Sequence, residues 1–126
     1  MRSNEPLFCP EDLISSYTRR QAIEDGVLVD LSVHEITRSH WKILVACTAS
    51  VFAVIEAAVG QRGQDLPGIL HDIFSLAKLA MRRAREGERL VRFTVLVNRR
   101  AVQLKLHIGP GDTPAPVLTI MLPNED

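Results

Sequence analysis

The last third of the chain alternates apolar and polar residues in three consecutive runs. Odd-numbered positions are apolar in the first run, and even-numbered positions are apolar in the next two. The apolar positions are Val91, Phe93, Val95 and Val97, then Val102, Leu104, Leu106 and Ile108, and finally Leu118, Ile120 and Leu122. A period of two is typical of a strand with one buried face. We therefore predict that the chain ends in an antiparallel meander of three strands.

Two capping boxes predict short helices in the first forty residues. Thr18 and Gln21 have the spacing at which a hydroxyl and an amide satisfy the free N–H groups of a first helical turn, and so do Ser32 and Glu35. Between the two predicted helices, residues 27–29 are apolar and indicate a brief extended segment.

Two longer helices are predicted in the middle of the chain. The first runs from Trp41 to about Val59, and its only charged residues are Lys42 and Glu56. Apolar side chains surround it, so we expect a helix that is buried on most sides or lies in a subunit interface. The second runs from Leu66 to about Glu86, with Asp65 as its N-cap and a buried stripe at helical spacing.

This order of elements predicts an α+β fold. About four N-terminal helices should pack on one face of a C-terminal three-stranded antiparallel meander. Three strands suffice when a helical layer covers one face. The 126 residues are expected to form a single domain, residues 1–126, with one core.

Composition limits the partners of this domain. The chain is 46% hydrophobic, and its 15 basic residues balance its 15 acidic ones. A neutral chain has no overall field to attract nucleic acid or an anionic membrane, so such binding would need a local patch.

The N-terminal residues have no apolar signal core, and the longest apolar stretch, residues 43–55, is shorter than the roughly 20 residues of a membrane span. We therefore expect a cytoplasmic protein without a membrane partner. Cys9 and Cys47 form no motif, and Cys47 is expected in the core as a thiol rather than in a disulfide.

The outward face of the predicted sheet is the first candidate binding surface. Its cations lie on the first two strands and the turn between them: Arg92, Arg99, Arg100, Lys105 and His107. Such a face could contact a phosphate backbone or an acidic protein. The alternative, which the balanced net charge favours, is a solvated sheet face whose charges discourage edge pairing.

A second polar surface follows the last predicted helix. One stripe at helical spacing contains His71, Ser75, Lys78, Arg82 and Arg85. Cations near a helix C-terminus stabilise the helix by themselves, so a solvated helix face accounts for this stripe.

The sequence predicts no catalytic, metal or cofactor residues. The four histidines are scattered, without the spacing of metal ligands. Asp25 and Asp30 could act as paired carboxylates near Tyr17, although the sequence favours roles at a helix end and a turn. The Gly-rich segment 109–112 is followed by a strand, so it is expected to be a hairpin connection rather than a phosphate-binding loop.

Three segments carry a resemblance to a known group of proteins. Residues 16–30 read SYTRRQAIEDGVLVD, residues 102–112 read VQLKLHIGPGD, and residues 118–126 close the chain with LTIMLPNED. These segments resemble a family of small uncharacterised bacterial proteins of plasmids, phages and integrative elements. The resemblance implies an origin in a mobile genetic element and carries over no activity or functional residue.

Small mobile-element proteins without catalytic motifs often act by binding. The resulting hypothesis is a non-enzymatic interaction protein that blocks a host defence complex, such as a CRISPR effector or a restriction enzyme. One alternative is a nucleic-acid-binding accessory protein that uses Arg92, Arg99, Arg100 and Lys105, and another is a small enzyme with a site near Asp25 and Asp30. Exposed apolar residues on the helix predicted at 41–59 would also suit a homodimer.

Overall fold

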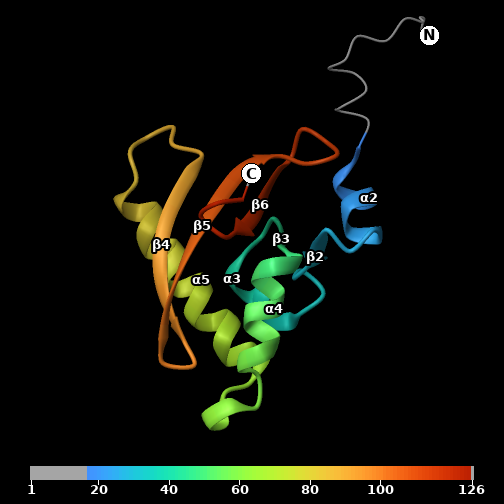
Figure 1. The fold of residues 1–126 in the computed structure, drawn as a ribbon. Coiled ribbons are helices and arrows are strands. Elements are labelled where there is room, and N and C mark those ends of the chain that lie inside the picture. Colours follow the sequence, from blue (N-terminus) through green and yellow to red (C-terminus); the bar gives the residue numbers. More distant parts are fainter. Residues whose placement is uncertain (1–16, 126) are drawn as a thin grey trace, which may run out of the picture.

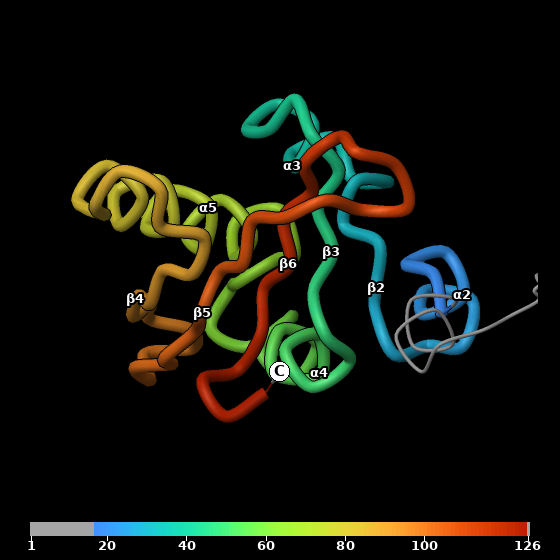
Figure 2. The backbone as a smooth tube through the Cα atoms, turned by 90° about the horizontal axis from the view of Figure 1, so that it is seen from above, coloured from blue at the N-terminus to red at the C-terminus, as the bar shows by residue number. Residues whose placement is uncertain are grey.

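The computed structural model describes residues 17–125 and contains one five-stranded mixed sheet, with the strand order β2-β3-β6-β5-β4. Every neighbouring pair is antiparallel except β3 and β6, which are parallel. Figures 1 and 2 show β4 at one margin of the sheet and β2 at the other. The strands are β2 (Leu28–Asp30), β3 (Leu44–Thr48), β4 (Leu90–Val97), β5 (Arg100–Pro110) and β6 (Pro116–Met121).

Two helices supply most of the helical core. Their bounds are Ala49–Ala58 for α4 and Leu66–Arg83 for α5, with the short 3₁₀ turn η1 (Gln61–Gly63) between them. Helix α3 (Glu35–His40) packs on α5, and α2 (Arg19–Glu24) contacts β2 at the margin of the sheet (Figure 1). Within residues 17–125, no helix combines the length and the apolarity that crossing a bilayer would require.

The alternation predicted for the last third of the chain is confirmed on the helical side of the sheet. On β4, Val91, Phe93, Val95 and Val97 are buried and the residues between them are exposed. Leu104, Leu106, Leu118 and Ile120 join the same core from β5 and β6. Phe74 of α5 is the largest fully buried side chain in this core.

The predicted three-stranded meander packed under about four N-terminal helices is wrong. Strands β4, β5 and β6 do form consecutive antiparallel pairs, but β6 continues into a parallel pair with β3, and β2 extends the sheet further. The helices are also not one layer, because α3 covers α5 rather than the sheet.

The helix predicted from Trp41 to Val59 is in fact a strand followed by a helix. Residues 45–48 of β3 are all buried, because β3 lies inside the sheet and both of its faces are covered. A strand buried on both faces reads as a continuous apolar run, and periodicity cannot distinguish that run from a buried helix. The missed signal is Thr48, whose hydroxyl accepts a hydrogen bond from Val51 N at 3.3 Å and caps α4.

Two of the three predicted helix N-caps are confirmed. The Thr18–Gln21 capping box is present in both directions, and Asp65 accepts a hydrogen bond from Gly68 N at the start of α5. The second capping box is wrong. Ser32 Oγ instead accepts a hydrogen bond from Val45 N at 2.8 Å, so the hydroxyl joins the loop to β3 and His34 becomes the N-cap of α3.

The β4–β5 hairpin turns through two residues that both have left-handed backbones. Asn98 has φ 52° and Arg99 has φ 64°, and Val97 pairs with Arg100 across the turn. Turns of this kind favour glycine at the second position, because a Cβ is strained there. Arg99→Gly is therefore expected to raise the free energy of unfolding by about 1 kcal/mol. Urea denaturation measures the change, and Arg99→Ala, which loses the same charge but keeps a Cβ, should not produce it.

Candidate functional site

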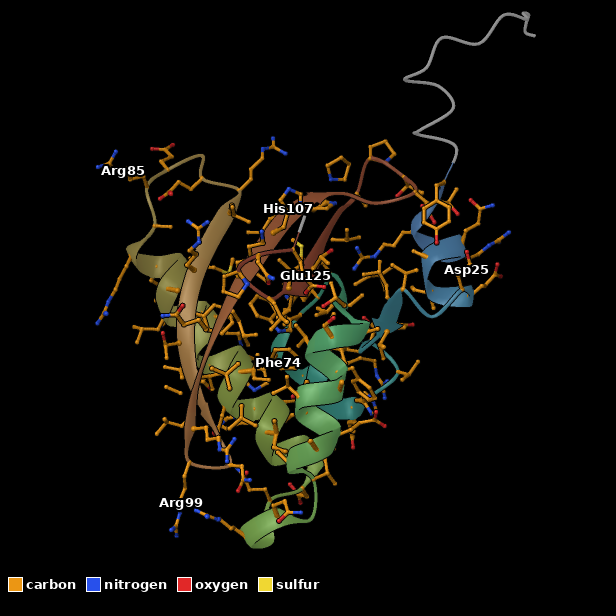
Figure 3. All side chains as sticks on the ribbon, in the orientation of Figure 1. Asp25, Phe74, Arg85, Arg99, His107 and Glu125 are labelled. Atoms are coloured by element: carbon orange, nitrogen blue, oxygen red, sulfur yellow. The ribbon has the colours of Figure 1, made fainter. Side chains whose placement is uncertain are left out.

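Of the five predicted binding residues, Arg92, Lys105 and His107 lie on the outer face of the sheet, the face opposite the helical core. Arg100 was expected on the same face, but it pairs with the buried Val97 and lies beside residues of α4 on the helical side. Arg92 and Lys105 are direct cross-strand partners, and His107 lies two residues further along β5, opposite Leu90. Arg99 and Arg100 lie at the hairpin turn, which is roughly 20 Å from His107 along the strand. Figure 3 shows Arg99 and His107 near opposite ends of the hairpin.

The outer face is less open than the alternation alone predicts. Arg92, Thr94, Leu96, Gln103 and His107 are exposed as expected. Lys105 was expected to be solvated, but only 8% of it is exposed, and the outward-facing Val117 and Met121 are buried as well.

Helix α2 accounts for part of this burial, because Arg19 reaches from it over β6. The Arg19 guanidinium donates to Thr119 Oγ1 and to Leu118 O, both at 2.7 Å. Partial burial lowers the pKa of Arg19, although the carboxylates of Asp30 and Asp112 oppose that shift. Arg19 therefore anchors α2 to the sheet, and its guanidinium already has hydrogen-bond partners within the fold.

Asp112, in the loop after β5, holds the first turn of α2 against that loop by hydrogen bonds. Its two carboxylate oxygens accept hydrogen bonds from Arg19 N at 2.6 Å and from Arg20 N at 3.1 Å. A carboxylate there satisfies free N–H groups and faces the positive end of the helix dipole. Gly109 and Pro110 are the last residues of β5 and pair with β6, so the predicted hairpin connection begins at Gly111, and Asp112 within it caps α2. The loop also packs over the outer face, since a Cβ on Gly111 would lie 2.9 Å from the Val117 side chain.

The C-terminal residues cover the sheet near β3. Glu125 Oε1 accepts hydrogen bonds from Thr48 Oγ1 at 2.7 Å and from Leu122 N at 2.8 Å. Burial, with a smaller contribution from the Glu125 charge, raises the pKa of Cys47 to about 12. The prediction that Cys47 is a buried free thiol is confirmed, whereas Cys9 lies outside the described residues.

The exposed part of the outer face is therefore the β4–β5 hairpin. Arg92 is exposed and lies beside the largely buried Lys105, and two like charges directly opposite each other on a sheet repel. The His107 ring lies over Gly109, where an added Cβ would approach Cε1 to 2.8 Å. An anionic group placed over Arg92 and His107 would relieve the repulsion between Arg92 and Lys105.

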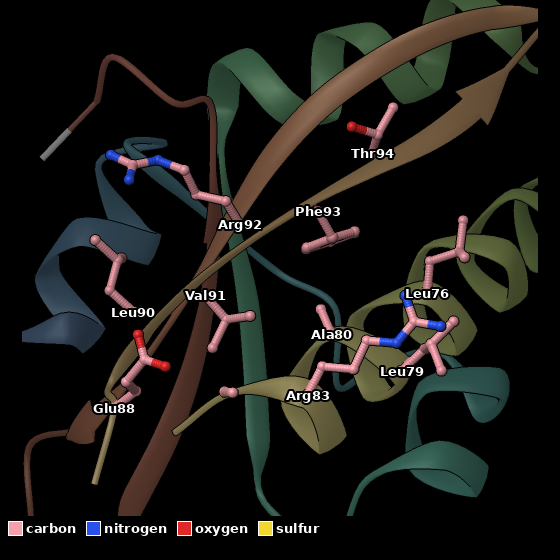
Figure 4. Close-up of a pocket in the computed structure, with 11 residues that line it drawn as sticks. Leu76, Leu79, Ala80, Arg83, Glu88, Leu90, Val91, Arg92, Phe93 and Thr94 are labelled. Carbon is pink, nitrogen blue, oxygen red and sulfur yellow. The ribbon is translucent and has the colours of Figure 1, made fainter. Parts of the chain in front are cut away.

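A groove of about 520 Å³ adjoins this face at the open edge of β4. Residues 90–94 form one wall, and Leu76, Leu79, Ala80 and Arg83 of α5 form the other (Figure 4). Neither the groove nor its apolar helix wall was predicted from the sequence, because the pairing of α5 with an edge strand is a long-range feature.

The polar stripe predicted on α5 is partly covered by α3. His40 Nε2 lies 3.0 Å from His71 Nδ1, and Lys78 Nζ lies 2.9 Å from His40 Nδ1. Burial lowers the pKa of His40, and electrostatic interactions with Lys78 and His71 lower it further. A neutral His40 accepts a hydrogen bond from the Lys78 ammonium at Nδ1, so these groups hold α3 on α5.

The carboxylates of the alternative enzyme hypothesis are engaged in local structure. Asp25 is the C-cap residue of α2 and accepts a hydrogen bond from Tyr17 Oη at 3.0 Å. Asp30 accepts one from Ser32 N at 2.9 Å, which forms a turn at the end of β2. Among residues 17–125, no group of three His, Cys, Asp or Glu side chains could hold a metal ion.

Comparison with known proteins identifies a family but no activity. A family model described as "Family of unknown function (DUF6573)" matches residues 4–126. No curated protein matches the chain, and no solved structure matches it.

Proposed function

Since the chain belongs to DUF6573, a family of unknown function, its role has to be inferred from its own surfaces, and we propose that it is a non-enzymatic interaction protein that binds an acidic partner protein. The binding surface is the outer face of the β4–β5 hairpin, centred on Arg92, Lys105 and His107. The observation that carries the proposal is the direct cross-strand pairing of Arg92 with Lys105.

Charge complementarity favours an acidic partner at this face. Two adjacent cations repel each other. A carboxylate of the partner bound to the exposed Arg92 makes charge-assisted hydrogen bonds to it, and its negative charge offsets the repulsion from the buried Lys105. Thr94 and Gln103, which are also cross-strand partners, add neutral hydrogen-bonding groups next to Arg92. The exposed Leu96 gives the same face an apolar contact.

The resemblance to proteins of mobile genetic elements suggests what the partner is. We propose a cytoplasmic host protein complex, and within that class a defence complex such as a CRISPR effector or a restriction enzyme. The partner would present an acidic segment, so a blocker of this kind would mask a protein surface rather than imitate DNA.

Nucleic acid is the second candidate, because Arg99 and Arg100 are exposed at the tip of the same hairpin. A phosphate backbone that crosses the hairpin tip would contact Arg99 and Arg100, with Arg100 on the helical side of the sheet. Binding through phosphates would weaken by orders of magnitude between about 50 and 200 mM salt.

Two defined anions distinguish the candidates. Fluorescently labelled poly-L-glutamate and a single-stranded oligonucleotide are titrated with the full chain and followed by anisotropy. Poly-L-glutamate is expected to bind more tightly than the oligonucleotide. Arg92→Glu should weaken the binding of poly-L-glutamate by about tenfold or more. Lys42→Glu, a matched reversal at another exposed position, should bind like the wild type.

Tighter binding of the oligonucleotide, with dependence on Arg99 and Arg100, would overturn the proposal in favour of nucleic acid. Binding of neither probe, or binding that Arg92→Glu leaves unchanged, would remove this face as the site. A pull-down from the native host should then recover a complex with the wild-type chain and Lys42→Glu, but not with Arg92→Glu.

A further inference from the structure

We infer that the open edge of β4 pairs with β4 of a second copy of this chain, so that two sheets join into one across a twofold axis. This pairing goes beyond the proposed partner and uses the backbone edge of β4, which borders the proposed binding face and shares Arg92, Thr94 and Leu96 with it. The two margins of the sheet differ in length and in what covers them. At one margin, β2 has three residues and contacts α2, whereas β4 at the other has eight.

Strand β4 has hydrogen-bonding groups available for a partner. Arg89 O accepts a hydrogen bond from Ile108 N at 2.8 Å, so the odd-numbered residues direct their backbone groups toward β5. The even-numbered residues from Leu90 to Leu96 therefore direct their N–H and C=O groups to the open edge. Two apolar side chains lie on this edge, with Leu90 39% exposed and Leu96 61% exposed.

Apart from the charge of Arg92, β4 has few of the features that prevent pairing. Residues 90–97 contain no proline or lysine, and all eight are in one unbroken ladder with β5. Long, flat edge strands with exposed apolar residues are those that recruit another strand. Arg92 is the single charge on the strand, so it is the residue that a pairing register has to accommodate.

One register accommodates Arg92 and pairs the exposed leucines. Facing residues must share a side of the sheet, so even-numbered residues oppose even-numbered ones. With the two copies of Phe93 on the axis, the facing pairs are Arg92 with Thr94, Leu90 with Leu96, and Val91 with Val95. Centring on Thr94 instead would oppose Arg89 to Arg99, and centring on Arg92 would oppose its two copies. Both alternatives place like charges together.

Helix α5 has a matching self-complementary stripe on the side that borders the groove. Asp72, Leu76, Leu79 and Arg83 follow at spacings of four, three and four residues. The last three line the groove beside β4, and Leu79 is exposed. When this stripe meets a copy of itself running in the opposite direction, Asp72 faces Arg83 and Leu76 faces Leu79. An interface in which one patch recognises itself is what a twofold dimer requires.

The two halves of the interface can share one axis. From Leu90 to Phe93 a strand advances about 10 Å, and from Arg83 to the middle of the stripe a helix advances nearly the same distance. Arg83 is the last residue of α5, Leu90 is the first residue of β4, and both line the groove. The centre of the helix stripe therefore lies about level with Phe93. A second copy fills the groove with its own α5 and β4. The charge pairing along α5 and the strand register both favour this occupant.

Light scattering after size exclusion tests the inference with the full chain. The wild type should have twice the 14.0 kDa monomer mass. Thr94→Pro removes an N–H that faces the open edge, so the variant should be a folded monomer. Thr94→Ala keeps that N–H and should remain a dimer. Circular dichroism and thermal unfolding confirm the fold of each variant.

Charge exchange identifies the helix pairing. Asp72→Arg and Arg83→Asp should each weaken the dimer by about tenfold, because each places like charges opposite each other. An equal mixture of these two variants should form a heterodimer, since each then supplies the charge that the other needs. A wild-type monomer at all concentrations would overturn the inference, as would a dimer that Thr94→Pro and the charge reversals leave intact. Binding of poly-L-glutamate by such a monomer would still support the proposed function.

Discussion

Replacing Phe74 with alanine is expected to lower the free energy of unfolding by about 3–5 kcal/mol. Phe74 is fully buried on α5 and belongs to the core beneath the sheet. Its ring lies edge-on to that of Trp41, the C-cap residue of α3, at 6.0 Å between centroids. The loss combines the transfer energy of the ring with an unfilled cavity beneath two helices. Since whole domains are stable by only about 5–15 kcal/mol, this single change should bring the chain close to unfolding.

Urea denaturation at fixed protein concentration measures the effect of the Phe74 substitution, because self-association would otherwise contribute to the apparent stability. Phe74→Leu keeps most of the volume and should cost much less than alanine. Ser75→Ala changes an exposed neighbour on the same helix and should be nearly neutral. A loss below about 1 kcal/mol for Phe74→Ala would contradict the placement of this ring at the centre of the core.

Asp112→Ala is expected to release α2 from the sheet, with a loss of about 1–2 kcal/mol. The substitution removes both acceptors of the Arg19 and Arg20 N–H groups. It also removes a negative charge that lies near the Arg19 guanidinium. Because α2 has only six residues, packing and caps rather than its own hydrogen bonds must hold it.

Amide hydrogen exchange localises the effect of the Asp112 substitution. Residues 19–24 should exchange faster in Asp112→Ala, whereas the amides of β5 and β6 should keep their protection. Asp112→Asn retains one carbonyl acceptor without the charge and should lie between the alanine variant and the wild type. Unchanged protection of residues 19–24 in Asp112→Ala would contradict the capping role.

The candidate binding face combines residues that sequence patterns predict with others that they cannot. Alternation correctly placed Arg92 and His107 on the outer side, because a period of two depends only on neighbours along one strand. It misjudged Lys105, because the burial of Lys105 depends on segments that fold over the sheet. Arg19 and Asp112 were missed as a pair, since they are 93 residues apart and no local pattern relates them.

Local chemistry in the sequence was sufficient for strands β4, β5 and β6, for the Asp65 cap, and for the capping box at Thr18. Each of these depends on side chains within a few residues of one another, so its energy is largely independent of the rest of the fold. Tertiary structure alone decided that β3 is a strand and lies parallel to β6. An apolar run is stable in either form, and the covering layers on both sides of the sheet select the extended one. The same long-range packing left β4 at an open edge beside α5, which is where the chain has a surface complementary to itself.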